Sequence, residues 1–117
     1  MEMKNCRLYK SEIVRKRNEF KEIFSSTRVM SSPSLTLRWI SSPTRKIGFI
    51  VSKDVAQKAV LRNRIKRQLR EIYRTNKDEF SNHAQYVVQA RKLILNKTFI
   101  EIEADLITLA KETNAQK

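Results

Sequence analysis

The residues best suited to chemistry lie in one basic stretch, "KAVLRNRIKRQLREIYR", at positions 58–74. Seven of its side chains are lysine or arginine, and Glu71 is its only acid. The arginine guanidinium is a planar fork that matches two phosphate oxygens. Acids at helical spacing, which would offset the repulsion between the cations, are almost absent. The pattern therefore favours binding of a polyanion, and the side chains expected to take part are Lys58, Arg62, Asn63, Arg64, Lys66, Arg67, Arg70 and Arg74.

The same stretch keeps an apolar rhythm that predicts an amphipathic helix. Its core stripe on a helical wheel consists of Leu61, Ile65, Leu69, Ile72 and Tyr73. The cationic side chains fall opposite this stripe or beside it. A solvated surface helix is the ordinary alternative, but the one-signed charge argues against it. A helix lying on a membrane is expected to carry Trp or Phe in its stripe, so nucleic acid is the favoured partner.

The charge of the whole chain agrees with a nucleic-acid partner. Its 117 residues include 25 Lys and Arg against 12 Asp and Glu, a formal net charge of +13. This excess costs self-repulsion unless a polyanion relieves it. The length fits a single domain over residues 1–117. The sequence contains no apolar run of membrane-spanning length and no signal-peptide pattern, and the single cysteine, Cys6, fits a reducing cytoplasm.

Residue patterns for protein-based catalysis are missing. No Ser/His/Asp set and no metal-ligand spacing occurs, and Cys6 and His83 are the only cysteine and histidine. Glu101, Glu103 and Asp105 are spread around a predicted helix and read as a solvated face, whereas a protein nuclease needs acids that converge on metal. We expect no catalytic residue and no metal site in the protein itself.

Three helices are predicted to frame the site. The cationic helix is expected over residues 57–76. An earlier helix is predicted with Asn18 as its N-cap, and a last helix with a capping box of Thr98 and Glu101. The apolar stripe of the early helix is Phe20, Ile23 and Phe24, and that of the last helix is Phe99, Ile102, Leu106, Leu109 and Ala110, with Glu101, Asp105 and Glu112 opposite.

Three strands are predicted between these helices, over residues 35–40, 46–52 and 85–91. The first two are joined by a short turn, which favours an antiparallel hairpin. The long helix after the second strand is a crossover, so the second and third strands are expected to run parallel if adjacent. The fold class is α+β, an α/β sandwich with a small mixed sheet and three helices. Residues 1–15 are expected to be an extended arm and 114–117 a tail.

The motifs "GFIVSK" (48–53) and "RNRIKRQLRE" (62–71) resemble, in order and spacing, those of the protein component of bacterial ribonuclease P. The segments "NEFKEIF" (18–24) and "YVVQARK" (86–92) extend the resemblance to roughly residues 15–112. The resemblance implies a four-element sheet core and a left-handed crossover around the cationic helix, against the general right-handed rule. It also implies a bacterial, cytoplasmic accessory subunit of a ribonucleoprotein endonuclease.

The resemblance further implies the partners and their contacts. The partners would be the ribonuclease P RNA and the 5′ leader of precursor tRNA, with no membrane. Catalysis would belong to the RNA and its Mg²⁺, and the protein alone would bind no cofactor. Arg62, Asn63, Arg64, Lys66, Arg67 and Arg70 match the RNA-contacting helix of the family. Phe20, Phe24 and Lys53 match a cleft that takes the single-stranded leader, where bases stack on aromatic faces.

Three positions depart from the family pattern. Asp54 stands where a second lysine is frequent, Leu93 follows Lys92 where proline is frequent, and the aromatic expected near Arg38 is represented by Trp39, which faces the other way. Plain core packing is the alternative reading of the two phenylalanines. For the whole chain, a non-enzymatic basic RNA-binding protein of ribosomal type is the competing interpretation, and an independent protein ribonuclease is disfavoured.

Overall fold

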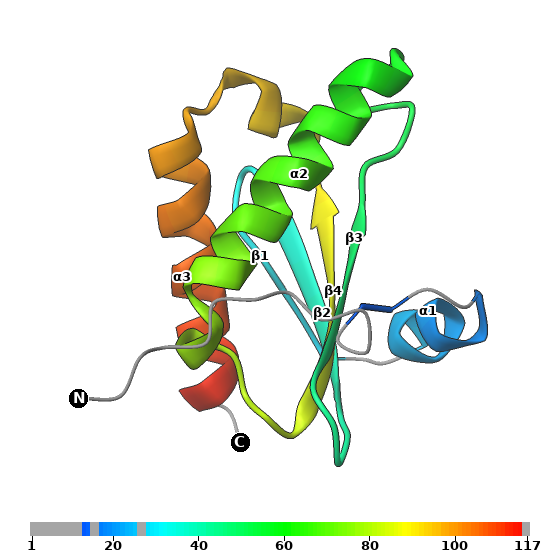
Figure 1. Ribbon diagram of the computed structural model, residues 1–117, viewed down its shortest axis with the longest axis vertical. Coiled ribbons are helices and arrows are strands. Elements are labelled where there is room, and N and C mark those ends of the chain that lie inside the picture. The colour runs from blue at the N-terminus through cyan, green and yellow to red at the C-terminus, as the bar shows by residue number, and fades with distance from the viewer. Residues whose placement is uncertain (1–12, 15–16, 26–27, 116–117) are drawn as a thin grey trace.

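A computed structural model describes residues 13–14, 17–25 and 28–115, and three helices and four strands make up its regular structure (Figure 1). The elements in chain order are α1 (Arg17–Phe24), β1 (Val29–Ser31), β2 (Leu35–Ser41), β3 (Lys46–Ile50), α2 (Ala59–Thr75), β4 (Ala84–Ala90) and α3 (Phe99–Ala115). Two short 3₁₀ helices, η2 (Lys77–Glu79) and η3 (Lys92–Asn96), flank β4.

The strands form one mixed sheet in the order β1-β2-β4-β3. β1 pairs antiparallel with β2, β2 pairs antiparallel with β4, and β3 pairs parallel with β4. The predicted α+β class, the mixed sheet and the parallel pair on either side of the long helix are confirmed.

The predicted hairpin between the second and third strands is wrong. β2 and β3 are joined by only four residues, 42–45, but β4 lies between them. The reason is visible in the burial of β4, where Tyr86, Val87 and Val88 are all fully buried. A strand that is apolar on both faces is most stable in the middle of a sheet, where helices cover both sides.

The crossover from β3 through α2 to β4 is left-handed. In Figure 1, α2 lies in front of the sheet, β3 and β4 both run upward, and β4 lies to the left of β3. This agrees with what the family resemblance implied, against the general rule for parallel connections.

Helices cover both faces of the sheet. On one face α2 and α3 pack over a cluster that includes Leu37, Trp39, Phe49, Tyr86 and Val88. On the other face α1 packs over a smaller cluster centred on Val87. The alternation predicted for residues 35–40 is confirmed, because Leu35, Leu37 and Trp39 are buried while Thr36, Arg38 and Ile40 are half-buried on the opposite face. Among the described residues no helix is both long and apolar enough to cross a bilayer.

Several local expectations need correction. Asn18 lies inside α1, which begins at Arg17, and is therefore not its N-cap. A short edge strand, β1, completes the four-element sheet that the resemblance implied, at residues where the sequence pattern predicted no strand. Phe99, predicted to point inward, is 37% exposed. It is the first residue of α3, and because side chains in a helix lean toward its N-terminus, its ring extends beyond the helix end.

The capping box of α3 is confirmed. The backbone N–H of Thr98 donates to Glu101 Oε1 at 2.9 Å, and the backbone N–H of Glu101 donates to Thr98 Oγ1 at 3.2 Å. The helix runs to Ala115, two residues into the segment expected as a tail. The expected arm falls outside the described residues except for Ile13 and Val14, which lie along β3, with the Val14 N–H donating to the Ile47 carbonyl at 2.9 Å.

Candidate nucleic-acid interface

The α2 helix has the two faces predicted from its sequence. Ile65, Leu69, Ile72 and Tyr73 are buried against the sheet and α3, and Leu61 packs at the edge of the same cluster. Burial of this stripe fixes the rotation of the helix, and the basic side chains are consequently held on the solvent side.

Most of the cationic face has no partner among the residues that the structure describes. The side chains of Lys58, Asn63, Arg64, Arg67 and Arg70 are exposed, and Lys66 is half-buried. Within the part of the chain that the structure describes, these six side chains make no hydrogen bond or ion pair. Unpaired cations at helical spacing repel one another, so this face is electrostatically prepared for an external polyanion.

Arg62 and Arg74 behave differently from their neighbours. The Arg62 Nη1 atom donates to the carbonyls of Ala56 and Gln57 at 3.0 and 2.6 Å, so this side chain secures the loop before α2. Arg74 forms an ion pair with Glu71. The hydrogen bond from Arg74 lowers the pKa of the Glu71 carboxyl. Of the eight residues predicted to bind nucleic acid, these two are thus also occupied within the protein.

The N-terminal end of α2 is strongly positive. Its first turn contains no acid, and its N-cap, Lys58, makes no side-chain capping hydrogen bond. The free N–H groups of a helix N-terminus carry partial positive charge, which here adds to the charge of the lysine.

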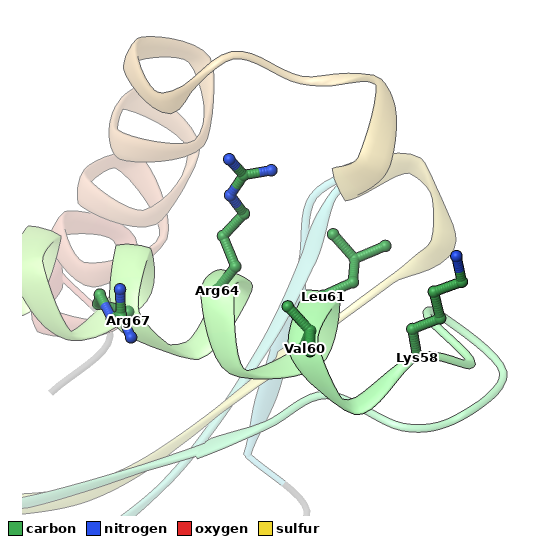
Figure 2. A pocket seen from close by; sticks show the side chains of 5 residues that line it. All are labelled: Lys58, Val60, Leu61, Arg64 and Arg67. Carbon is green, nitrogen blue, oxygen red and sulfur yellow. The ribbon is translucent and has the colours of Figure 1, made fainter.

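A hollow of about 500 Å³ lies along this end of α2. Figure 2 shows Val60 and Leu61 between Lys58 and Arg64, with Arg67 further along the helix. Val60 is 81% exposed, so the hollow has an apolar wall bordered by three cations. The two aliphatic residues were not among the predicted site residues, because exposed and buried aliphatic side chains look alike in a sequence.

A second surface forms where α1 lies on the opposite face of the sheet. The Lys46 ammonium on β3 bonds Glu19 of α1 at 2.7 Å and fastens the helix to the sheet. Phe20 packs directly over Gly48, the only glycine in the chain. A Cβ atom at position 48 would lie 2.7 Å from Phe20 Cε1 and 2.9 Å from its Cζ, so the glycine provides the room for this ring.

Phe24 is the more accessible of the two rings, with 37% of its surface exposed. The guanidinium carbon of Arg38 on β2 lies 5.3 Å from the centroid of the Phe24 ring. Arg38 pairs with Val87 across the strands, and Val87 pairs in turn with Gly48. Both predicted phenylalanines therefore lie over the same row of the sheet, one toward β3 and the other toward β2.

Lys53 is not beside the two rings. It is exposed in the turn that follows β3, five positions beyond Gly48, and Figure 1 shows this turn near the start of α2 and apart from α1. Asp54 is exposed in the same turn. Trp39, the nearest aromatic to Arg38 in the sequence, is only 3% exposed and belongs to the core on the α2 side.

The carboxylates considered for catalysis make individual structural contacts. Glu103 accepts a hydrogen bond from Asn76 Nδ2 at 3.2 Å, and Asp105 accepts one from Ser34 Oγ at 2.5 Å. The solvated face predicted for these acids is therefore wrong in part, because two of them tie α3 to neighbouring segments. Among the described residues no group of three His, Cys, Asp or Glu side chains is placed to hold a metal ion.

The chain matches known proteins over nearly its whole length. A family model described as Ribonuclease P matches residues 8–114. The ribonuclease P protein component of Geobacillus kaustophilus is 34% identical over 107 residues, which cover 89% of this chain and 88% of the relative. The component from Xanthomonas campestris pv. campestris (strain B100) is 35% identical over 112 residues, which cover 94% of this chain and 75% of the relative.

Solved structures show the same fold. The RNase P protein from Thermotoga maritima superposes with a TM-score of 0.77 at 26% identity, covering 86% of this chain and 96% of that one. The Staphylococcus aureus RNase P protein gives a TM-score of 0.79 at 24% identity, covering 89% and 96%. The fold and the exposed basic helix define the class as a small basic α+β protein with a four-stranded mixed sheet. The family match makes this more specific: the chain belongs to the ribonuclease P protein family.

Proposed function

We propose that this chain acts as the protein subunit of a bacterial ribonuclease P, binding the enzyme's RNA through α2 and the 5′ leader of precursor tRNA beside α1. Family membership supports the first part, since the relatives are ribonuclease P protein components. The observation that carries the RNA contact is the row of exposed cations on α2, which have no partner in the described part of the chain. The site of action would be the cytoplasm, where precursor tRNA is made.

The two surfaces suit two kinds of RNA. On α2, a line of arginines and lysines that make few hydrogen bonds to the described part of the protein is suited to binding the phosphates of a folded RNA. Beside α1, the exposed ring of Phe24 and the half-buried ring of Phe20 offer apolar faces to unstacked bases. Stacking on aromatic rings tolerates many base sequences, which suits a substrate set with varied leaders. Lys53, at the far end of β3, would meet a leader that continues along this strand.

We assign the bond-breaking chemistry to the RNA and its Mg²⁺. The carboxylates of α3 support this division, because Glu103 and Asp105 are engaged in separate contacts instead of converging on one point. The protein would contribute binding energy for the RNA and for the leader, and with it a lower requirement for Mg²⁺.

Reconstitution tests the proposal. A bacterial ribonuclease P RNA is assayed for cleavage of precursor tRNA at low Mg²⁺, with and without this protein. We expect the protein to restore cleavage and the RNA-free protein to be inactive. Cleavage by the protein alone would place catalysis in the chain. RNA binding without any stimulation would favour the interpretation as a basic RNA-binding protein of ribosomal type.

A further inference from the structure

Arg38 occupies an unusual place for a charged residue. It lies in β2, in the interior of the four-stranded sheet, with β1 on one side and β4 on the other. Its cross-strand neighbours are Val29 and Val87, both apolar. A charged side chain among apolar neighbours in the middle of a sheet loses contacts with water. Proteins normally compensate for this loss with a hydrogen-bond or ion-pair partner.

No such partner is present in the described part of the chain. The Arg38 guanidinium makes no hydrogen bond and no ion pair there, and its Nε atom is buried without an acceptor. Among the described residues, the specific contact of this guanidinium is with the Phe24 ring, at 5.3 Å from the guanidinium carbon to the ring centroid. An arginine stacked on an aromatic ring is held in one orientation while its outer nitrogens stay available for an acceptor.

The surroundings of this pair are suited to a nucleic-acid strand. The next row of the same sheet face consists of Thr36 on β2, Gln89 on β4 and Ile50 on β3, all half-buried. This row adds hydroxyl and amide groups beside the guanidinium. Phe20 borders the surface on the β3 side, above Gly48.

We propose that Arg38, stacked on Phe24, binds a phosphate of the 5′ leader and makes leader recognition partly electrostatic in this protein. Phe24 then has a second role beside base stacking, because it also orients the guanidinium, and Phe20 is a neutral stacking surface only. This inference rests on the proposed function, since it specifies how the surface beside α1 engages its substrate. It also gives a role to a position where the family pattern offers an aromatic residue.

The salt dependence of leader affinity distinguishes a phosphate contact from neutral stacking. Each phosphate contact to a single strand contributes about −0.7 to the slope of log K against log salt concentration. The relevant quantity is the ratio of two affinities of the reconstituted complex, one for a precursor tRNA with a leader of about five nucleotides and one for mature tRNA; this leader length lies within the range of single-strand site sizes. We expect this ratio to fall with salt in the wild type.

The test compares Arg38→Gln and Arg38→Lys with Lys111→Gln. Lys111 is an exposed cation on α3, on the opposite side of the sheet, and it controls for net charge. Arg38→Gln should reduce the leader-dependent ratio roughly tenfold, as expected for loss of a hydrogen bond to a charged group, and should flatten its salt slope by about 0.7. Arg38→Lys should keep most of the slope, and Lys111→Gln should change neither quantity.

The Phe24 contact provides a second, independent readout. If Phe24 acts through Arg38, the double variant Phe24→Ala/Arg38→Gln should lose less leader affinity than the two single losses combined. Each variant is first shown by circular dichroism to melt as a folded domain. A wild-type leader ratio and slope in Arg38→Gln would overturn the inference while the proposed function stands. A wild-type complex that does not distinguish precursor from mature tRNA would instead overturn leader binding by this subunit.

Discussion

Gly48 and Phe20 are matched: the ring lies so close above the glycine that a Cβ atom there would come within 2.7 Å of Phe20 Cε1. Val14, from the segment that runs along β3, lies at the same spot, 3.0 Å from that Cβ position. Three parts of the chain thus meet at a point where only hydrogen fits. The glycine sets how closely the aromatic surface approaches the sheet.

The variant Gly48→Ala tests this closeness. The methyl group would displace the Phe20 ring, because the two closest atoms belong to the outer end of a side chain that can rotate away, and it would also press on the Val14 Cβ atom. We expect weaker binding of precursor tRNA that carries a leader, with little change for mature tRNA. Affinities of both substrates for the reconstituted complex provide the measurement. Equal weakening of both substrates would instead indicate a general loss of fold.

Phe20 and Phe24 are expected to respond differently to truncation. Phe24 is 37% exposed and therefore the less buried of the two rings, so Phe24→Ala should lower the melting temperature less than Phe20→Ala does and should weaken leader binding by about 1–3 kcal/mol. Phe20 is half-buried against Val14 and Gly48, so Phe20→Ala should reduce leader binding and folding stability together. Denaturant unfolding beside the two affinities separates these effects. If neither variant changes the preference for the leader-bearing substrate, the assignment of this surface fails.

The two faces of α2 should separate binding from stability. Arg67 is exposed and unpartnered among the described residues, so Arg67→Ala should lower affinity for the ribonuclease P RNA and reduce the salt slope by about 0.7 to 0.9. The wild-type slope, if about six phosphates are neutralised, should be on the order of −4 to −5. Leu69 is fully buried, so Leu69→Ala should cost roughly 2–5 kcal/mol of folding stability. Equal destabilisation by both variants would contradict the orientation of the helix.

Arg62 should contribute to both RNA affinity and folding stability. Its hydrogen bonds to the carbonyls of Ala56 and Gln57 hold the loop that leads into α2. Arg62→Ala is therefore expected to lower folding stability by roughly 1 kcal/mol as well as RNA affinity. Arg64→Ala is the matched control, because this exposed side chain makes no contact of that kind and should affect RNA affinity alone. Thermal melts of the free proteins decide between the two roles.

Glu101 gives α3 a predictable response to acid. The hydrogen bond from the Thr98 backbone lowers the pKa of this carboxyl below its ordinary value of 4.5. A group whose pKa is lowered by folding stabilises the protein above its unfolded pKa and loses that effect as the pH falls through its folded pKa. The melting-temperature difference between wild type and Glu101→Ala should therefore be largest near neutral pH and shrink below pH 4.5. A difference that is constant down to strongly acidic pH would argue against the ionised cap.

The sequence predicted the elements well and their arrangement less well. Periodicity identified α2 because its buried stripe and its basic face are chemically distinct, and it identified β2 because buried and half-buried residues alternate strictly. Periodicity could not predict the order of the strands in the sheet. The four-residue link from β2 to β3 favours a hairpin locally, and only the requirement to bury both faces of β4 moves that strand between them.

In the candidate site, too, local features could be predicted from the sequence, whereas contacts between distant elements could not. The arginines of α2 could be predicted because a charge pattern is local. The contact of Arg38 with Phe24 could not, since it joins residues from α1 and β2 whose proximity depends on the packing of α1 across the sheet. The edge strand β1 was missed because three residues are too few for a period, although Val29 and Met30 before "SSPS" were a usable signal. Arg62 was assigned only to RNA because hydrogen bonding to a preceding loop leaves no pattern in the sequence.

The position of β4 also dictates when the protein can fold. This strand joins the two parts of the sheet, yet it is the last strand to be synthesised. Until it is made, β3 has no strand to pair with, and the apolar stripe of α2 has only part of its packing surface. Contacts between segments distant in sequence form slowly, because loop closure must precede any gain from pairing. The basic segment, complete at Arg74, therefore lacks part of its packing surface until β4 is completed at Ala90, and a polyanion that engages the segment in that interval would compete with completion of the sheet.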